Sequence, residues 1–141
     1  MVPLVVIDTN VLVSALRSKK GASYKAIKLI GTGRFNIAVS VPLILEYESV
    51  AKRQRRQTGL SDQEVDDILD YICSVAVQQS IFFLWRPFLR DQADDMLLEL
   101  SVASESDFIV THNIRHFDGI EQFGIHALPP REFLRQIGEI T

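Results

Sequence analysis

The sequence predicts an α/β domain built around a mainly parallel β-sheet. Short apolar runs alternate along the chain with longer segments in which apolar residues recur at helical spacing, an order typical of strands joined by crossover helices. The first run, residues 5–7, is apolar at every position, as expected for a strand covered on both faces. No repeat or Pro/Gly-rich linker interrupts the 141 residues, so we expect one domain spanning 1–141.

The first half of the chain carries clear signals for the starts of helices. Pro42 stands at a first helical position, and Ser61 with Glu64 three residues later forms the pattern of a capping box. After the first strand we expect a helix at 11–16, a helix at 23–30, a strand at 35–39, a helix from 42 to about 54, and a helix from 61 to about 77.

The second half repeats the alternation of strands and helices. The apolar run "SIFFLW" predicts a buried third strand at 80–84, with Phe83 or Trp85 available to reach a partner surface. After it we expect a helix from 91 or 92 to 103, a strand at 107–110, a weaker strand at 125–128 and a last helix at 130–137. The expected sheet therefore has five strands.

Composition limits the function classes. Apolar residues make up 47% of the chain, enough for a full core. The single cysteine, Cys73, excludes an internal disulfide framework and a cysteine-based zinc site. The net charge of −3 means that a polyanionic partner needs a local basic patch. No apolar run approaches the ~20 residues that cross a membrane, and Asp8 interrupts the first run, so we expect a cytoplasmic protein without a membrane segment.

Acidic and polar residues follow the expected strands at the edge where sites form in parallel sheets. Asp8 ends the first strand, and the segment 111–113 (Thr-His-Asn) ends the fourth. Glu46 interrupts an apolar helix start, and Asp94 and Asp95 open another helix. Carboxylates held together repel one another unless a cation compensates, and oxygen ligands without cysteine suit Mg²⁺ or Mn²⁺. Such ions serve phosphodiester hydrolysis.

Each acid also has a structural interpretation. Asp8 could cap the following helix, and Asp94 and Asp95 could favour a helix N-terminus. On a helical wheel Glu46 and Glu48 lie at opposite edges of the apolar stripe, and the wheel does not choose between them. Asp107 could replace one of the acids, although a position at a strand start argues against it.

Four stretches in order resemble one family along almost the whole chain. "VVIDTNVLVSAL" resembles the opening of PIN domains, metal-dependent ribonucleases that include VapC-like toxins. "SVPLILEYESV" resembles the helix that bears the family's glutamate, "DDMLLELSVASESDFIVTHNIRHF" its later helix and strand, and "IHALPPREFL" its closing strand and helix. The resemblance implies a three-layer α/β/α domain with a central parallel sheet and acids clustered at one rim.

The resemblance also implies a role for particular residues. Asp8 matches the first acid, Glu46 the second and, counting back from Thr111, Asp95 rather than Asp94 the third. In this assignment Asp8 and Asp95 are the principal metal ligands, Glu46 binds metal through water or helps to activate it, and Asn113 orients a metal-bound water or a ligand. Asn113 stands where many members carry a fourth aspartate. The positions that support these residues are Thr9, Asn10, Thr111 and His116, the last standing where VapC-like members often have an aspartate.

The resemblance therefore implies a Mg²⁺- or Mn²⁺-dependent endoribonuclease, the toxin of a toxin–antitoxin pair, forming a homodimer and bound by an antitoxin. We expect Lys19, Lys20 and Arg115 to contact RNA phosphates. The neutral Asn113 motivates an alternative, a catalytically weak PIN module that binds RNA or a protein partner. A phosphoaspartyl enzyme with Asp8 as nucleophile is disfavoured, because Asn10 stands where such enzymes carry a second aspartate. A receiver-like domain is disfavoured too, because the first strand ends in a single acid.

Overall fold

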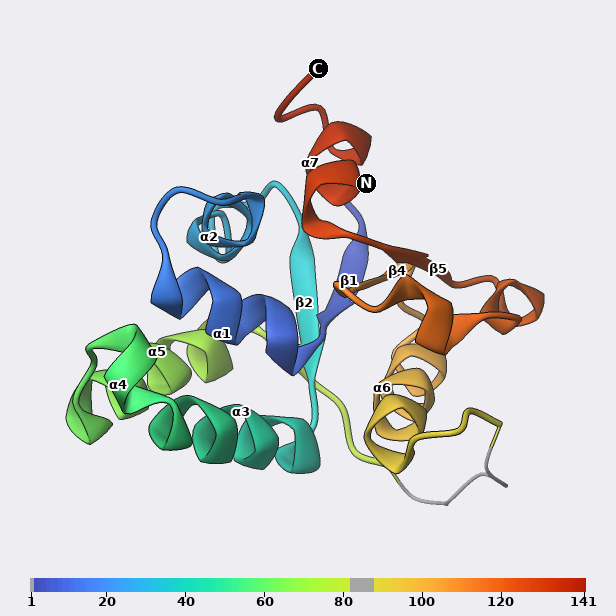
Figure 1. Ribbon diagram of the computed structural model, residues 1–141. Coiled ribbons are helices and arrows are strands. Elements are labelled where there is room, and N and C mark those ends of the chain that lie inside the picture. The colour runs from blue at the N-terminus through green and yellow to red at the C-terminus, as the bar shows by residue number, and fades with distance from the viewer. Residues whose placement is uncertain (1, 82–87) are drawn as a thin grey trace.

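The computed structural model describes residues 2–81 and 88–141. Its centre is an all-parallel sheet of five strands in the order β3-β2-β1-β4-β5 (Figure 1). The strands are β1 (Leu4–Ile7), β2 (Asn36–Val39), β3 (Val77–Gln78), β4 (Phe108–Val110) and β5 (His126–Leu128). The predicted mainly parallel five-stranded sheet is therefore confirmed.

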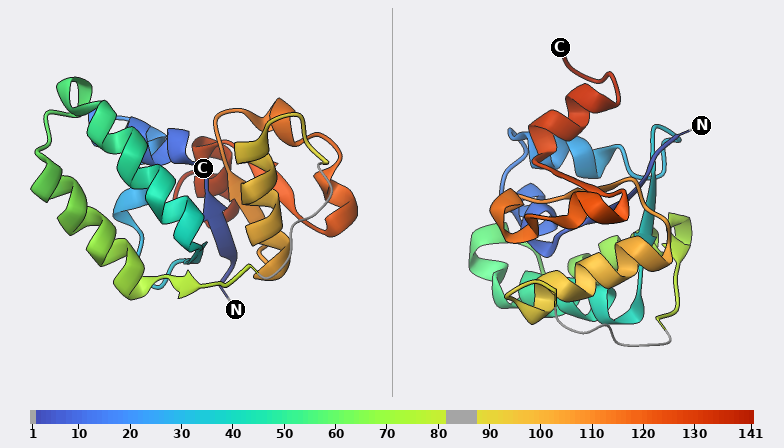
Figure 2. Two further views of the ribbon diagram at one scale, coloured as in Figure 1. Left: turned by 90° about the horizontal axis from the view of Figure 1, so that it is seen from below. Right: turned by 90° about the vertical axis from the view of Figure 1, so that its right-hand side faces the viewer.

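Helices flank the sheet on both faces, as the α/β class requires. Two helices, α1 (Thr9–Arg17) and α2 (Ala22–Lys28), join β1 to β2, and α3 (Val41–Arg53), α4 (Arg55–Thr58) and α5 (Asp62–Val75) join β2 to β3. The remaining helices are α6 (Gln92–Ala103) before β4 and α7 (Pro130–Gln136) after β5, with 3₁₀ turns η1 (Ile114–Phe117) and η2 (Ile120–Phe123) between β4 and β5. Figures 1 and 2 show α2 and α7 on one side of the sheet and α3 and α6 on the other.

The core explains why the first apolar run does not alternate. Val5 and Val6 are fully buried although their side chains point to opposite faces of β1, because helices cover both faces. On the face of α7, the Phe35 and Phe133 rings meet edge to face at 4.9 Å between centroids. The predicted capping box of α5 is also confirmed: Glu64 donates its backbone N–H to the Ser61 hydroxyl at 3.1 Å, and Ser61 N–H reaches the Glu64 carboxylate at 3.0 Å.

The third strand begins earlier in the chain than the predicted segment 80–84. The strand β3 lies earlier, where Val77 pairs with Ala38, and residues 80 and 81 are not in a strand. The rest of the predicted strand, residues 82–84, lies outside the described residues, as does Trp85. Val77 and Gln78 are exposed at the sheet edge, so burial gives this strand no apolar signature. Helix α5 ends at Val75, and the chain then pairs directly with the free edge of β2.

The sequence also did not predict the short helix α4 and the two 3₁₀ turns. Gly59, in the left-handed conformation at φ 72°, ends α4 with its N–H on the carbonyl of Arg55. Elements this short carry too few residues to show a period. Within residues 2–81 and 88–141, no helix combines the length and apolar character needed to cross a bilayer.

The strand order fixes where a site can form. From β1 the chain first builds outward through β2 and β3, then returns to the other side of β1 with β4 and β5. The topological switch therefore lies between β1 and β4, and the crevice beyond their carboxyl ends is the usual ligand position in such sheets. Asp8 and Thr111 are the residues that directly follow these two strands.

Candidate acidic site

Asp8 is held at the carboxyl end of β1 by contacts with β4. Its backbone N–H donates to the Val110 carbonyl at 2.9 Å, which extends the β1–β4 pairing by one residue. The residue is 8% exposed, and its Oδ2 accepts a hydrogen bond from the Thr111 hydroxyl at 2.7 Å. Thr111 Oγ1 in turn accepts the Asn113 backbone N–H at 3.0 Å. Two predicted residues, Asp8 and Thr111, therefore form one fixed unit at the switch point.

Glu46 reaches the same edge from α3. Its carboxylate accepts the hydroxyl of Thr9, the residue after Asp8. The next residue, Tyr47, is buried and donates its hydroxyl to the Ile7 carbonyl, which ties α3 to the end of β1. Glu48 faces elsewhere and pairs with Lys52 at 3.1 Å. The tertiary structure thus makes the choice that the helical wheel left open, in favour of Glu46.

The two aspartates at the start of α6 point to different places. Asp95 Oδ1 accepts the backbone N–H groups of Phe88 at 3.2 Å and Leu89 at 2.8 Å, so this carboxylate holds the loop before α6. Asp94 Oδ2 lies 3.2 Å from Nδ1 of His116, and Asp94 lies within electrostatic range of Asp8. The structure brings Asp94, and not the predicted Asp95, toward Asp8. Figure 1 shows the first turns of α1, α3 and α6 at one edge of the sheet.

The segment after β4 connects the site to α1 and α2. The His112 backbone N–H donates to Oδ1 of Asn10 at 3.3 Å, and its Nε2 lies 3.0 Å from the Ser23 hydroxyl. Asn113 is exposed beside Thr111. His112 and Ser23 were not predicted as individual site residues. Nothing in their sequence spacing indicates that the end of β4 contacts α2.

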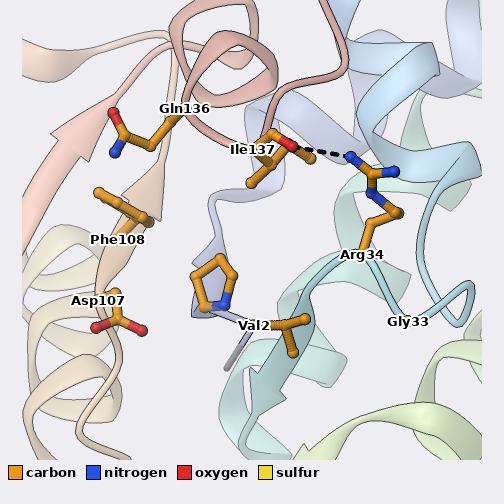
Figure 3. A pocket seen from close by; sticks show the side chains of 8 residues that line it. Val2, Gly33, Arg34, Asp107, Phe108, Gln136 and Ile137 are labelled. Carbon is orange, nitrogen blue, oxygen red and sulfur yellow. Dashed lines mark hydrogen bonds between the residues drawn. The ribbon is translucent and has the colours of Figure 1, made fainter.

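Asp107, the substitute acid considered from the sequence, lies at the opposite edge of the sheet. Its Oδ2 accepts the Leu4 backbone N–H at 3.0 Å, at the amino end of β1. Asp107 lines a depression of about 620 Å³ together with Phe108. Figure 3 shows both residues, and also Arg34, which donates to the Ile137 carbonyl. Asp107 is therefore not part of the acidic site.

The three basic residues expected to contact RNA lie in two separate depressions. Arg115 lines a depression of about 690 Å³ together with Asp94 and His116. Lys19 and Lys20 line a different depression of about 380 Å³ between α2 and α7. Only Arg115 is therefore placed beside the acidic residues.

Burial and mutual repulsion disfavour the charged forms of the site's aspartates. Burial raises the pKa of Asp8, the Thr111 hydrogen bond opposes this rise, and the negative charge of Glu46 adds to it. Burial also raises the pKa of Asp94, with added repulsion from Asp91 and Asp8, while His116 lowers it. Burial lowers the pKa of His112. The negative charge of Asp8 raises this pKa, and the positive charge of Arg17 lowers it further. The site thus concentrates negative charge at a cost in folding stability, an arrangement typical of functional sites.

The donor groups at the acidic edge are of the types that bind a hard cation, but they are only loosely gathered. Asp8, Glu46 and Asp94 supply oxygen ligands from three elements, and added positive charge would relieve the repulsion described above. Within the described part of the chain, no three Asp, Glu, His or Cys side chains are close enough together to hold an ion directly. The types of donor group present suit Mg²⁺ or Mn²⁺, which commonly keep several water ligands and need few direct protein contacts.

The raised pKa of Asp8 predicts how stability depends on pH in the absence of metal. Because the folded state holds the Asp8 proton more tightly than the unfolded state, the free energy of unfolding falls as pH rises from below about 3.9, the usual pKa of aspartate, through the folded value. Asp8→Asn removes this loss, so in EDTA the variant should melt at a higher temperature than wild type at pH 7. Thermal unfolding between pH 3.5 and 8 measures the difference, which should shrink toward acid pH. A wild type that gains stability over Asp8→Asn with rising pH would contradict the assignment.

The fold and the placement of the acids define an α/β domain of parallel topology with an acidic carboxyl edge. A PIN domain family model matches residues 4–115, and the chain belongs to the PIN domain family. A search of curated proteins finds no match.

Among solved structures, the chain is similar to a chain in the crystal structure of VapBC2 from Rickettsia felis bound to a DNA fragment from their promoter. The TM-score is 0.60 at 15% sequence identity, and the match covers 88% of this chain and 98% of that one. This likeness supports the fold, and the predicted PIN resemblance is confirmed.

Proposed function

We propose that the protein is a metal-dependent endoribonuclease that hydrolyses RNA phosphodiester bonds, and that it is the toxin of a toxin–antitoxin pair. The observation that carries the proposal is the gathering of Asp8, Glu46 and Asp94 at the carboxyl edge of the sheet in a member of the PIN domain family. Burial and repulsion disfavour the charged forms of Asp8 and Asp94, and such a cost calls for a function that uses their charge.

In this proposal Asp8, Glu46 and Asp94 would hold Mg²⁺ or Mn²⁺. A bound ion of this kind polarises a phosphoryl oxygen and lowers the pKa of a bound water. Thr111 orients the Asp8 carboxylate, and Thr9 orients that of Glu46. The exposed amide of Asn113, next to Thr111, is available to orient substrate or water.

His116 and Arg115 have roles on the substrate side in the same proposal. Both line the depression that contains Asp94. The Arg115 guanidinium is permanently charged and suits a phosphate oxygen. His116, paired with Asp94, fixes the orientation of that carboxylate and can carry a proton at Nδ1.

The proposed partners rest on the VapBC2 likeness. That complex includes the protein to which this chain is similar, and by analogy we propose an antitoxin that binds this protein. The homodimer expected from the family resemblance belongs to the same proposal.

A second candidate function is a PIN module that binds RNA or a protein partner and cleaves poorly. Two observations favour it: the neutral Asn113 at a position where many members have an acid, and the loose placement of the carboxylates within the described residues. Both candidates keep the acidic edge as the functional surface, and they differ in metal-dependent cleavage.

The experiment that separates the two is RNA cleavage by the purified protein with Mn²⁺, Mg²⁺ or EDTA. Structured and single-stranded RNAs are both offered as substrates. We expect cutting with either metal, none in EDTA, and recovery when Mn²⁺ is added in excess of EDTA. Binding of RNA without cutting under all three conditions would favour the binding module. Cutting that continues in EDTA would exclude the metal-dependent nuclease.

A further inference from the structure

The depression between α2 and α7 is lined by five basic side chains. They come from the α1–α2 connection, from α2 and from α7, and are Lys19, Lys20, Lys25, Lys28 and Arg131. We call this set the basic groove. All five residues are exposed, and the groove measures about 380 Å³. The sequence analysis considered only the first two of them.

Within the described residues, no carboxylate side chain compensates the charges of the basic groove. Among the residues that the structure describes, none of the five forms an ion pair with a carboxylate, and no acidic residue lines the groove. Glu139 contacts the groove only through its backbone carbonyl, which accepts from Lys25 at 3.4 Å, while its carboxylate pairs with Arg34 at 3.0 Å. Five like charges repel one another in a chain of net charge −3, so the groove suits an anionic ligand.

The types of residue indicate which kind of anion. Four of the five are lysines, which contact phosphates as point charges and do not need the fixed geometry of a base edge. Tyr24 also lines the groove and is half-buried, with Lys28 Nζ 6.0 Å from its ring centroid. An aromatic face among cations is the combination by which proteins bind single-stranded nucleic acid, since an unpaired base can stack on the ring.

The basic groove is connected to the acidic site by α1. This helix begins directly after Asp8 and ends at Arg17, two residues before Lys19. Its nine residues span roughly 14 Å, a distance that a few nucleotides of single strand can cross. His112 links the two ends of this route, because its backbone N–H donates to Asn10 of α1 and its ring contacts Ser23 of α2.

We propose that the basic groove binds the phosphate backbone of single-stranded RNA a few nucleotides away from the bond presented to the acidic edge. The inference rests on the proposed function for its choice of RNA as ligand. It predicts strong binding with little sequence preference, since lysines read charge and a tyrosine face accepts any base.

The test is RNA binding in EDTA, where the proposed cleavage cannot occur. Fluorescence anisotropy with a labelled 16-nucleotide single-stranded RNA compares wild type with the triple variant K19Q/K25Q/K28Q. The matched control is R53Q/R55Q/R56Q, which removes the same charge from exposed residues at the end of α3 and in α4, away from α7 in Figure 1. Circular dichroism melts establish that both variants fold.

We expect the groove variant to bind at least tenfold more weakly than the control at 100 mM salt. With five phosphate contacts, the slope of log K against log salt should be about −3.5, and the groove variant should reduce it to about −1.4. Equal affinities and slopes for the groove variant and the control would overturn the proposal. Tighter binding of an RNA duplex than of the single strand would overturn it as well.

The outcome is independent of whether the protein cleaves RNA. A protein that never cuts RNA but shows the groove effect would refute the nuclease and support the groove. If wild type cuts RNA and the groove variant binds RNA as tightly as the control, the nuclease is supported and the groove proposal is overturned. Competition by uridine monophosphate as strong as that by the oligonucleotide would assign the groove to a free nucleotide and overturn the role in strand binding.

Discussion

Asp8→Asn is expected to lower metal-dependent RNA cleavage by at least about 10³-fold. The buried Asp8 carboxylate is fixed by Thr111 at the switch point, and removing its charge takes away the central oxygen ligand of the proposed metal site. A bound metal ion supplies several kcal/mol to such reactions, and each ~1.4 kcal/mol is a factor of ten in rate. The asparagine keeps an oxygen that can accept the Thr111 hydroxyl, so the fold should be retained. The measurement is the initial rate of RNA cleavage with Mn²⁺.

The matched control for Asp8→Asn is Asp107→Asn. Asp107 is an exposed acid at the opposite edge of the sheet, and an asparagine there can still accept the Leu4 N–H. We expect this variant to cut RNA at the wild-type rate. Cleavage that survives Asp8→Asn would indicate a contaminant or a site elsewhere in the chain. Equal loss in both variants would indicate a general effect of charge and not a metal ligand.

The second large effect is expected from a comparison of Asp94→Asn with Asp95→Asn. Asp94 lines the depression with Arg115 and His116 and lies within electrostatic range of Asp8, so its substitution should lower cleavage about 10²-fold or more with little change in stability. Asp95 accepts two backbone N–H groups from the loop before α6, and an asparagine there keeps the acceptor oxygen but loses its charge, so the substitution should leave cleavage within about threefold and weaken folding by about 1 kcal/mol. Cleavage rates and urea unfolding of the two variants measure both quantities.

The reverse result is equally informative. If Asp95→Asn abolishes cleavage and Asp94→Asn does not, Asp95 is the third acid, as counting back from Thr111 predicts. That outcome would mean that Asp95 leaves the loop amides when metal binds. If both variants cut normally, neither acid belongs to the site, and the proposed ligand set would be reduced to Asp8 and Glu46.

The parts of the fold that the sequence predicted correctly have strong local signals. The buried strand β1 is apolar throughout, and α5 begins with a capping box. The edge strand β3 was misplaced because its residues are exposed and a more apolar run follows it. Hydrophobicity reports burial, so it identifies central strands better than edges.

The positions of the acids at the carboxyl edge could also be predicted only in part from the sequence. That Asp8 and Thr111 meet could be predicted, because parallel neighbouring strands end at the same edge. Neighbouring residues on a helix point about 100° apart, so the choice between Asp94 and Asp95 depends on the rotation of α6. This rotation is decided by the packing of α6 against β1, β4 and α3, which is a tertiary feature.

The sequence by itself determined the class of fold, the family resemblance and the edge of the sheet where acids gather, because these depend on periodicity and on residues that directly follow strands. The tertiary structure decided which acid of each pair faces the site and which distant residues share a surface. Arg131 joins Lys19 only because α7 packs against α2, more than 100 positions away in the chain. The local sequence pattern indicates which side chains of an element are buried, whereas the packing of the elements decides which of the remaining side chains meet.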